Sequence, residues 1–152
     1  MTTLHAKVAR GQARYYANLH PSAASAVNRD EILKLHTIAR YYGLRPLKGR
    51  GLIVPNARYI FVRTADGDML MHARFRHPSL AAGRPVLYAG EAYFEHGVLR
   101  WWSNGSGHYR PDADHADQAD LPMNLFRHHE DVRRRGVRPP RVADSAAGGS
   151  GF

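Results

Sequence analysis

The residues best suited to chemistry lie together in the stretch Ser103-Asn104-Gly105-Ser106-Gly107-His108-Tyr109-Arg110-Pro111. The glycines on either side of Ser106 allow a sharp turn and the close approach of a ligand. Side chains that can hydrogen-bond a ligand follow one another there: Ser106, His108, Tyr109 and Arg110. We predict that this stretch forms part of a functional site. The alternative is a tight strand exit that is held by its own hydrogen bonds.

A second candidate is Glu91, which lies in an apolar run that is typical of a strand. If His96-Gly97 forms a two-residue turn, Glu91 shares one sheet face with Tyr93, Arg100 and Trp102. Such a face would place a carboxylate, an arginine and a phenol side by side. If the turn takes three residues, this cluster dissolves, and Glu91 is then an edge carboxylate neutralised by a nearby arginine.

A third candidate is His77, between the second and third predicted strands. It would pair with His108 as acid and base, or else be a structural or solvated loop histidine. The run His128-His129-Glu130-Asp131 lacks a second histidine at zinc-site spacing. Residues 112–120 are acidic but lack the glycine and final glutamate of a calcium loop. We therefore predict no metal ion and no cofactor.

The chain contains no cysteine, which excludes disulfides, thiolate metal sites and thiol nucleophiles. No apolar run approaches the ~18–20 residues that span a bilayer. The N-terminus lacks the apolar stretch of a secretory signal. We therefore expect synthesis in the cytoplasm and no membrane partner. Delivery from the cell would require a specialised secretion system.

Positive charge is concentrated in the first third of the chain. Residues 1–50 contain nine lysines and arginines against two acids, within a total of +9 for the protein. Most of these cations are arginines, whose guanidinium groups suit phosphates and stacking on bases. A pI near 10.3 is typical of nucleic-acid binders. The charge therefore indicates RNA or another anionic ligand, with a merely solvated basic surface as the alternative.

The hydrophobic spacing predicts an α+β fold. Residues 28–43 have helical spacing, with Asn28 as a cap and Gly43 as a stop, and an earlier helix is predicted within residues 4–19. An antiparallel four-stranded meander follows, with strands at 59–62, 69–76, 86–95 and 98–103. A C-terminal helix is predicted to begin at Asp120. We expect one domain, 1–141, made of a basic helical part (1–56), the β-meander (57–111), and an acidic loop with a helix (112–141), before a disordered tail (142–152).

Several short motifs carry a family resemblance, in order along the chain: Arg58-Tyr59-Ile60-Phe61-Val62, His77-Pro78-Ser79-Leu80-Ala81-Ala82-Gly83, Ala89-Gly90-Glu91, Gly97-Val98-Leu99 and Ser106-Gly107-His108-Tyr109-Arg110-Pro111. Together they resemble the C-terminal module of plant IQ-motif calmodulin-binding proteins and related fungal and bacterial effector-like proteins, over roughly residues 58–138. The chain has no IQ motif, so the resemblance does not support calmodulin as a partner. Plant relatives often have arginine where Glu91 stands, which argues against a universal catalytic role for Glu91.

A weaker, architectural likeness is to barnase-like ribonucleases, in which a glutamate is the base, arginines hold the phosphate and a histidine is the acid. Fold analogy alone does not establish function. On this likeness the catalytic candidates are His108, Glu91 and His77. The substrate-binding candidates are Arg100, Ser106, Tyr109, Arg110 and Tyr93.

Three functions are compatible with these observations. The sharpest hypothesis is a metal-independent ribonuclease, as the effector or toxin domain of a bacterial protein, with an acidic immunity or chaperone protein as a further partner. The alternative is a non-catalytic module that binds a protein or an anionic ligand. An ADP-ribosyltransferase is the third, but the Arg, Ser-Thr-Ser and Glu-x-Glu signatures of the arginine-specific class are absent.

Overall fold

The computed structural model describes residues 4–20 and 27–134. Its helices are short: α1 (Leu4–Ala9), α2 (His77–Ala81), α3 (His129–Arg134) and the 3-10 helices η2 (Arg29–Glu31), η3 (Ala113–Ala119) and η4 (Met123–Leu125). The strands are β1 (Leu33–Ile38), β2 (Tyr41–Pro46), β3 (Arg58–Thr64), β4 (Met69–His72), β5 (Val86–Glu95), β6 (Val98–Ser103) and β7 (Phe126–Arg127). No helix in this part of the chain is long and apolar enough to cross a bilayer.

The prediction of an α+β fold with a four-stranded meander is wrong, because the protein is mostly β. The described strands form one mixed sheet in the order β2-β1-β4-β3-β5-β6-β7. Neighbouring strands are antiparallel except β6 and β7, which are parallel. Strand β5 pairs with β3 rather than with β4, since α2 carries the chain from β4 across to the other side of β3. Asp66-Gly67, a dipeptide typical of hairpin turns, lies in the turn that joins β3 to β4.

The largest error concerns residues 28–43, where the predicted helix is the β1–β2 hairpin. Asn28 does act as a cap, but only for η2. From there an alternation of period two prevails, with Leu35 opposite Leu44 across the hairpin. The tight turn between Ile38 and Tyr41 has Ala39 at a φ of +54°, a conformation normally signalled by glycine or asparagine. The prediction that the N-terminal part is helical is therefore wrong, apart from the short helices α1 and η2.

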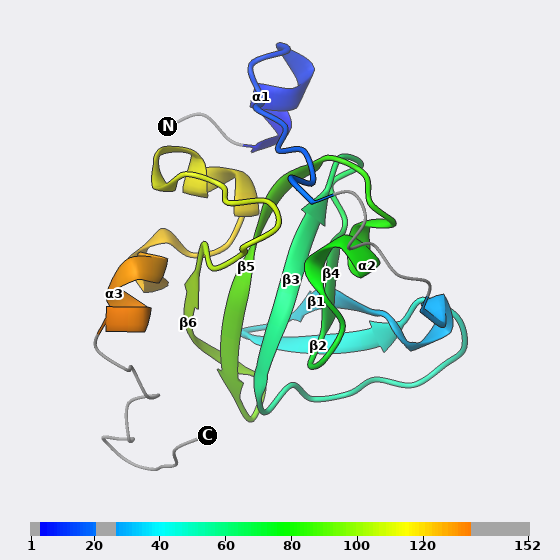
Figure 1. The fold of residues 1–152 in the computed structure, drawn as a ribbon. Helices are drawn as coiled ribbons and strands as arrows, with labels where there is room; N and C mark the ends of the chain where they lie inside the picture. The colour runs from blue at the N-terminus through cyan, green and yellow to red at the C-terminus, as the bar shows by residue number, and fades with distance from the viewer. Residues whose placement is uncertain (1–3, 21–26, 135–152) are drawn as a thin grey trace.

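The sheet is strongly curved, so that its β2 edge approaches the β5–β6 turn (Figure 1). The N–H of Tyr42 donates to the Gly97 carbonyl at 2.8 Å. Leu44 and Ile53 exchange two backbone hydrogen bonds of 2.8 and 2.7 Å, which lay residues 52–54 along the outside of β2. In Figure 1, β1 and β2 run across the direction of β3 and β5, and the result is a half-barrel.

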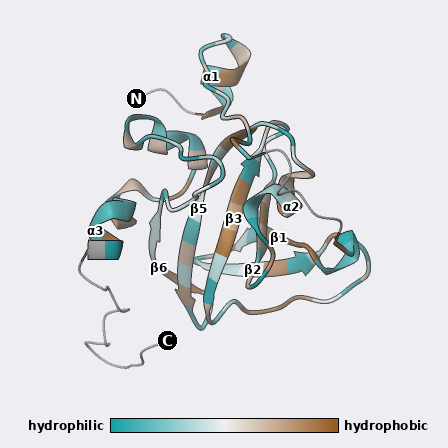
Figure 2. Ribbon diagram, in the orientation of Figure 1, coloured by the Kyte–Doolittle hydropathy of each residue, from teal (hydrophilic) through white to brown (hydrophobic). Residues whose placement is uncertain are grey.

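The hydrophobic core lies on the inner face of this half-barrel. Phe61 and Tyr88 each meet Trp102 there edge to face, with ring centroids 6.2 Å apart in both contacts. Figure 2 shows the hydrophobic character of β3 in the middle of the sheet. Helix α2 covers the same face with the buried Leu80. One core therefore gathers most of the sheet, α2 and the segment after β6.

The acidic stretch 112–120 packs against the sheet. It forms η3, whose Ala116, Gln118 and Ala119 are buried. Asp120, predicted to start a helix, has a φ of +57° and ends η3 instead. The short strand β7 then interrupts the predicted C-terminal helix, of which α3 is the part that forms. The predicted tail, 142–152, lies outside the described residues.

Gln118 joins the N-terminal segment to β5. Its side chain accepts from the Arg14 N–H at 2.8 Å and donates to the carbonyls of Arg14 and Leu87 at 2.7 and 2.9 Å. We expect Gln118→Leu to lower the free energy of unfolding by about 2–4 kcal/mol, because it leaves buried backbone groups without partners. Urea denaturation measures this loss. Gln12→Leu, at an exposed position, is the control, and equal losses in the two variants would contradict the assignment.

Candidate functional site

The predicted Ser106–Pro111 stretch is a tight turn just beyond β6. The Ser106 carbonyl accepts from the Arg110 N–H at 2.8 Å, and the Ser106 hydroxyl accepts from the Tyr109 N–H at 3.2 Å. Tyr109 is buried in the core, and its hydroxyl donates to the Arg84 carbonyl at 2.8 Å. Ser106 and Tyr109 therefore shape the turn, while His108 and Arg110 retain exposed surface.

His108 meets a second imidazole that the sequence did not indicate. Its ring packs edge to face against His20, with the ring centroids 5.6 Å apart. The Leu19 N–H donates to the His108 carbonyl at 2.7 Å, which fixes the N-terminal segment beside the turn. We call His20 and His108 the histidine pair.

Arg76 adds a positive charge next to the histidine pair. Partial burial lowers the pKa of His108, and the nearby His20 and Arg76 lower it further. Arg76 directly precedes α2 and is exposed. The histidine pair therefore lies in a positive field that an anion would relieve. Because such an anion would favour the imidazolium form, its binding would be accompanied by proton uptake.

His77 lies beneath this surface, as the first residue of α2. It is 7% exposed, and its Nε2 is 2.8 Å from the carbonyl oxygen of Gly90 on β5. The pKa of His77 is lowered to about 4. Burial is the main cause, the hydrogen bond to Gly90 opposes it, and the nearby His108 adds to the lowering. A neutral imidazole with its proton on Nε2 fits that contact. The structure therefore gives His77 the features of a residue that holds α2 against β5.

Glu91 lies on the outer face of the sheet, away from the core that buries Tyr109. The two-residue turn at His96-Gly97 forms as predicted, but a β-bulge shifts the register between Tyr93 and Phe94. As a result Glu91 is opposite Ser103, and the ion pair that it forms is with Arg58, at 3.9 Å. The structure therefore does not bring Glu91 together with the histidine pair.

The bulge also puts Trp102, which was predicted to share a face with Glu91, on the core side of the sheet. Trp102 is fully buried in the core, whereas Trp101 lies on the opposite face of β6, where it is also buried (3% exposed) and packs against Tyr93, with ring centroids 6.1 Å apart. Arg100 donates to Glu95 at 2.9 Å, and the Tyr93 hydroxyl donates to the same carboxylate at 2.8 Å. The carboxylate that accepts hydrogen bonds from both Arg100 and Tyr93 is therefore Glu95, which was not predicted from the sequence.

Of the predicted site residues, the structure groups His108 and Arg110 at the surface, with Ser106 and Tyr109 supporting them and His77 buried nearby. It places Glu91, Tyr93 and Arg100 on the outer face of β5 and β6. His20 and Arg76 were missed, and no spacing signal distinguishes either from other surface residues. Within residues 4–20 and 27–134, no three His, Asp or Glu side chains gather in a way that could hold a metal ion.

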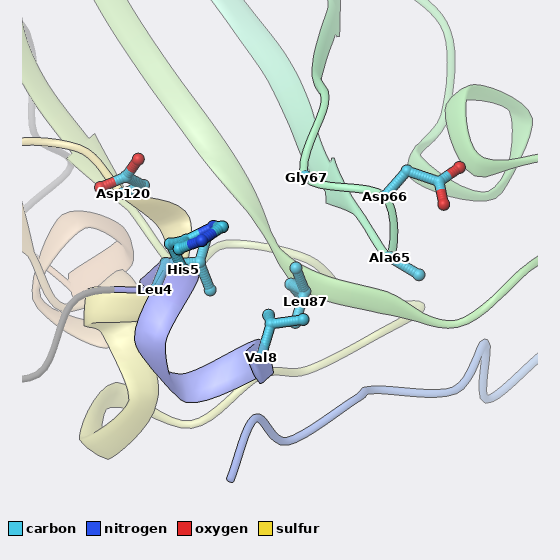
Figure 3. Close-up of a pocket in the computed structure, with 8 residues that line it drawn as sticks. All are labelled: Leu4, His5, Val8, Ala65, Asp66, Gly67, Leu87 and Asp120. Carbon is cyan, nitrogen blue, oxygen red and sulfur yellow. The ribbon is translucent and has the colours of Figure 1, made fainter. Parts of the chain in front are cut away.

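A separate hollow of about 240 Å³ lies between α1 and the β3–β4 turn (Figure 3). Its lining is Leu4, His5, Val8, Ala65, Asp66, Gly67, Leu87 and Asp120. None of the predicted site residues belongs to this lining. The histidine pair therefore remains the candidate site.

Comparison with known proteins bears on the motifs that surround this site. Residues 49–116 match the family model described as the IQ motif-containing protein middle domain. A curated relative, IQ domain-containing protein IQM3 of Arabidopsis thaliana, is 48% identical over 44 residues. That alignment spans 29% of this chain but only 10% of the relative. No solved structure gives a significant match.

The family description places the matched stretch in the middle domain rather than in a C-terminal module. The match begins before β3 and ends within η3, so it includes the turn that presents His108. The predicted resemblance is therefore confirmed: over residues 49–116, this chain is similar to the middle domain of the IQ motif-containing proteins.

Proposed function

We propose that this chain is a binding module for an anionic ligand, with RNA as the first candidate, and that the ligand binds at the histidine pair. The observation that carries the proposal is the contact between the His20 and His108 rings, whose centroids are 5.6 Å apart, close to the positive charge of Arg76. Two imidazoles and a guanidinium group offer hydrogen-bond donors and positive charge to a phosphate. The exposed Arg110, on the same turn as His108, adds a further cation.

RNA binding is tested by fluorescence anisotropy with a labelled single-stranded oligonucleotide. We expect Arg76→Gln and His108→Ala each to weaken binding by about tenfold or more, because hydrogen bonds to charged groups contribute about 1.5–3 kcal/mol. The control is Arg127→Gln, which removes an exposed arginine on β7. If all three variants weaken binding equally, the interaction is only general charge attraction.

The same measurement at several pH values tests the proton linkage. Because a bound phosphate favours the protonated imidazole of His108, affinity should rise as the pH falls from about 8 to 6. In His108→Ala this rise should be smaller. An affinity that does not depend on pH in the unmodified protein would contradict a role for the histidine pair.

A second candidate function is RNA cleavage without a metal ion, and the observation that favours it is that two imidazoles lie side by side. One imidazole would accept the proton of the 2′-hydroxyl, and the other would give a proton to the leaving 5′-oxygen. In this version His20 takes the role that we predicted for Glu91. In EDTA, purified protein should cleave RNA, and His20→Ala and His108→Ala should each lower the rate about 10²-fold or more. Binding without cleavage would leave the non-catalytic module as the function.

A further inference from the structure

Exposed apolar side chains are concentrated on the β1–β2 hairpin and on the segment that follows it. Tyr41 is 52% exposed and Val54 is 58% exposed, and Ile38 and Leu52 are exposed to a similar degree. We call these four residues the hairpin patch. Elsewhere in the described chain, large apolar side chains with this exposure are scattered: Val8, Tyr15, Leu19 and Met123.

The hairpin patch is continuous over two glycines. A Cβ atom built on Gly43 would lie 2.6 Å from Leu52 Cδ1 and 3.0 Å from Ile38 Cδ1, so both side chains cover that glycine. A Cβ atom built on Gly97 would lie 3.3 Å from Val54 Cγ1 and 3.7 Å from Tyr41 Cβ. The patch therefore extends from the hairpin to the β5–β6 turn as one surface.

The segment that forms most of this surface is rich in cations and contains no acids. Residues 32–65 contain seven lysines and arginines and no Asp or Glu. Three of the seven are engaged: Lys34 pairs with Asp68, Arg58 pairs with Glu91, and Arg63 donates to backbone carbonyls. The other four are exposed, and none forms an ion pair within the described part of the chain: Arg40, Arg45, Lys48 and Arg50. We call these four the basic rim.

We propose that the hairpin patch and the basic rim bind the surface of an anionic lipid bilayer. Apolar side chains that dip below the headgroups, together with arginines and lysines at the level of the phosphates, are the chemistry of peripheral membrane binding. The basic rim matches the charge of an anionic bilayer and opposes the pairing of two copies of this chain. This proposal departs from the expectation, drawn from the sequence, that the chain has no membrane partner. That expectation rested on the lack of a spanning segment, and peripheral binding needs no spanning helix in the described part of the chain.

The test is sedimentation of the full chain with sucrose-loaded vesicles of phosphatidylcholine, with and without 30% phosphatidylserine. We expect binding to the phosphatidylserine vesicles that decreases with added salt. The double variant Arg45→Gln, Arg50→Gln should lower the partition coefficient by more than about tenfold, since each cation contributes about fivefold at such a surface. Arg127→Gln, Arg133→Gln removes the same charge elsewhere and should lower it less than threefold.

The apolar part is tested by Val54→Asp, which should lower the partition coefficient by about tenfold or more, against Met123→Asp as an exposed control. Circular dichroism establishes that each variant is folded. The proposal is overturned if the chain does not sediment with anionic vesicles, or if patch and control variants lose binding equally. It is also overturned if poly-L-glutamate, rather than vesicles, shows the patch-dependent binding, because the partner is then an acidic protein.

Discussion

Gly90→Ala is expected to lower the free energy of unfolding by more than about 3 kcal/mol. A Cβ atom at this position would lie 1.8 Å from the Ser103 carbonyl oxygen and 2.8 Å from the Ser103 carbonyl carbon, and the nearest side-chain atom is Phe61 Cε2 at 3.1 Å. The first obstacle is the backbone of β6, which pairs with β5 at Glu91 and cannot move without breaking the ladder. Overpacking of a rigid core usually costs about 1–3 kcal/mol, and here both strands must shift.

Denaturation in guanidinium chloride measures this loss, and Gly107→Ala is the matched control. Gly107 lies in the turn from Ser106 to Pro111, has no atom within 4 Å of its ideal Cβ position, and is not among the glycines with positive φ. Its substitution should change stability by less than about 0.5 kcal/mol. Similar stabilities of the two alanine variants would mean that β5 and β6 are less tightly apposed than the structure shows.

The second large effect is expected at His77, as a loss of stability in acid. Burial lowers the pKa of this imidazole from an ordinary 6.5 to about 4. Because the unfolded chain binds the proton more readily, the stabilisation is fully present above about pH 6.5 and is lost as the pH falls through 4. The shift corresponds to roughly 3 kcal/mol between these limits.

Urea denaturation at several pH values between 7 and 3.5 measures this dependence. In His77→Gln the side-chain amide can still donate to Gly90 but cannot titrate, so the acid-induced loss should shrink by about 2–3 kcal/mol. A smaller dependence should remain, because burial also lowers the pKa of His72. His5→Gln, an exposed position, is the control. An unchanged pH profile in His77→Gln would show that His77 is not the buried neutral group.

The sequence was informative where a turn has a glycine and a strand has a uniform apolar pattern. Asp66-Gly67 and His96-Gly97 correctly indicated the hairpins β3–β4 and β5–β6. The β1–β2 hairpin turns at Ala39-Arg40, without glycine or asparagine, and its apolar residues also fit a helix. The pairing of β1 with β4 favours the strand pattern over the helical one, and such a long-range contact cannot be inferred from the local spacing of apolar residues.

The candidate site could be predicted from the sequence only in part. The Ser-Gly-His turn indicated His108 as a candidate because glycines, a histidine and an arginine are adjacent in the chain, and the structure leaves His108 partly exposed on that turn. Its partner His20 comes from a distant segment that the fold brings alongside through the Leu19–His108 hydrogen bond. The pairing of Glu91 with Ser103 rather than with Trp102 depends on a bulge at Arg100, which no turn rule predicts. His20 also lies outside the family match, so the histidine pair combines the matched stretch with a segment that precedes it.

The curvature of the sheet has a consequence for how other polypeptides can meet this protein. The N–H groups of Tyr42 and Leu44, on the outward side of the terminal strand β2, already donate to Gly97 and Ile53. A foreign chain could not add itself there as an extra strand without first displacing residues 52–54 and the β5–β6 turn. A partner at this end of the molecule must therefore be recognised through side chains. Aggregation by addition of strands to β2 is blocked, because the protein's own backbone already occupies that edge.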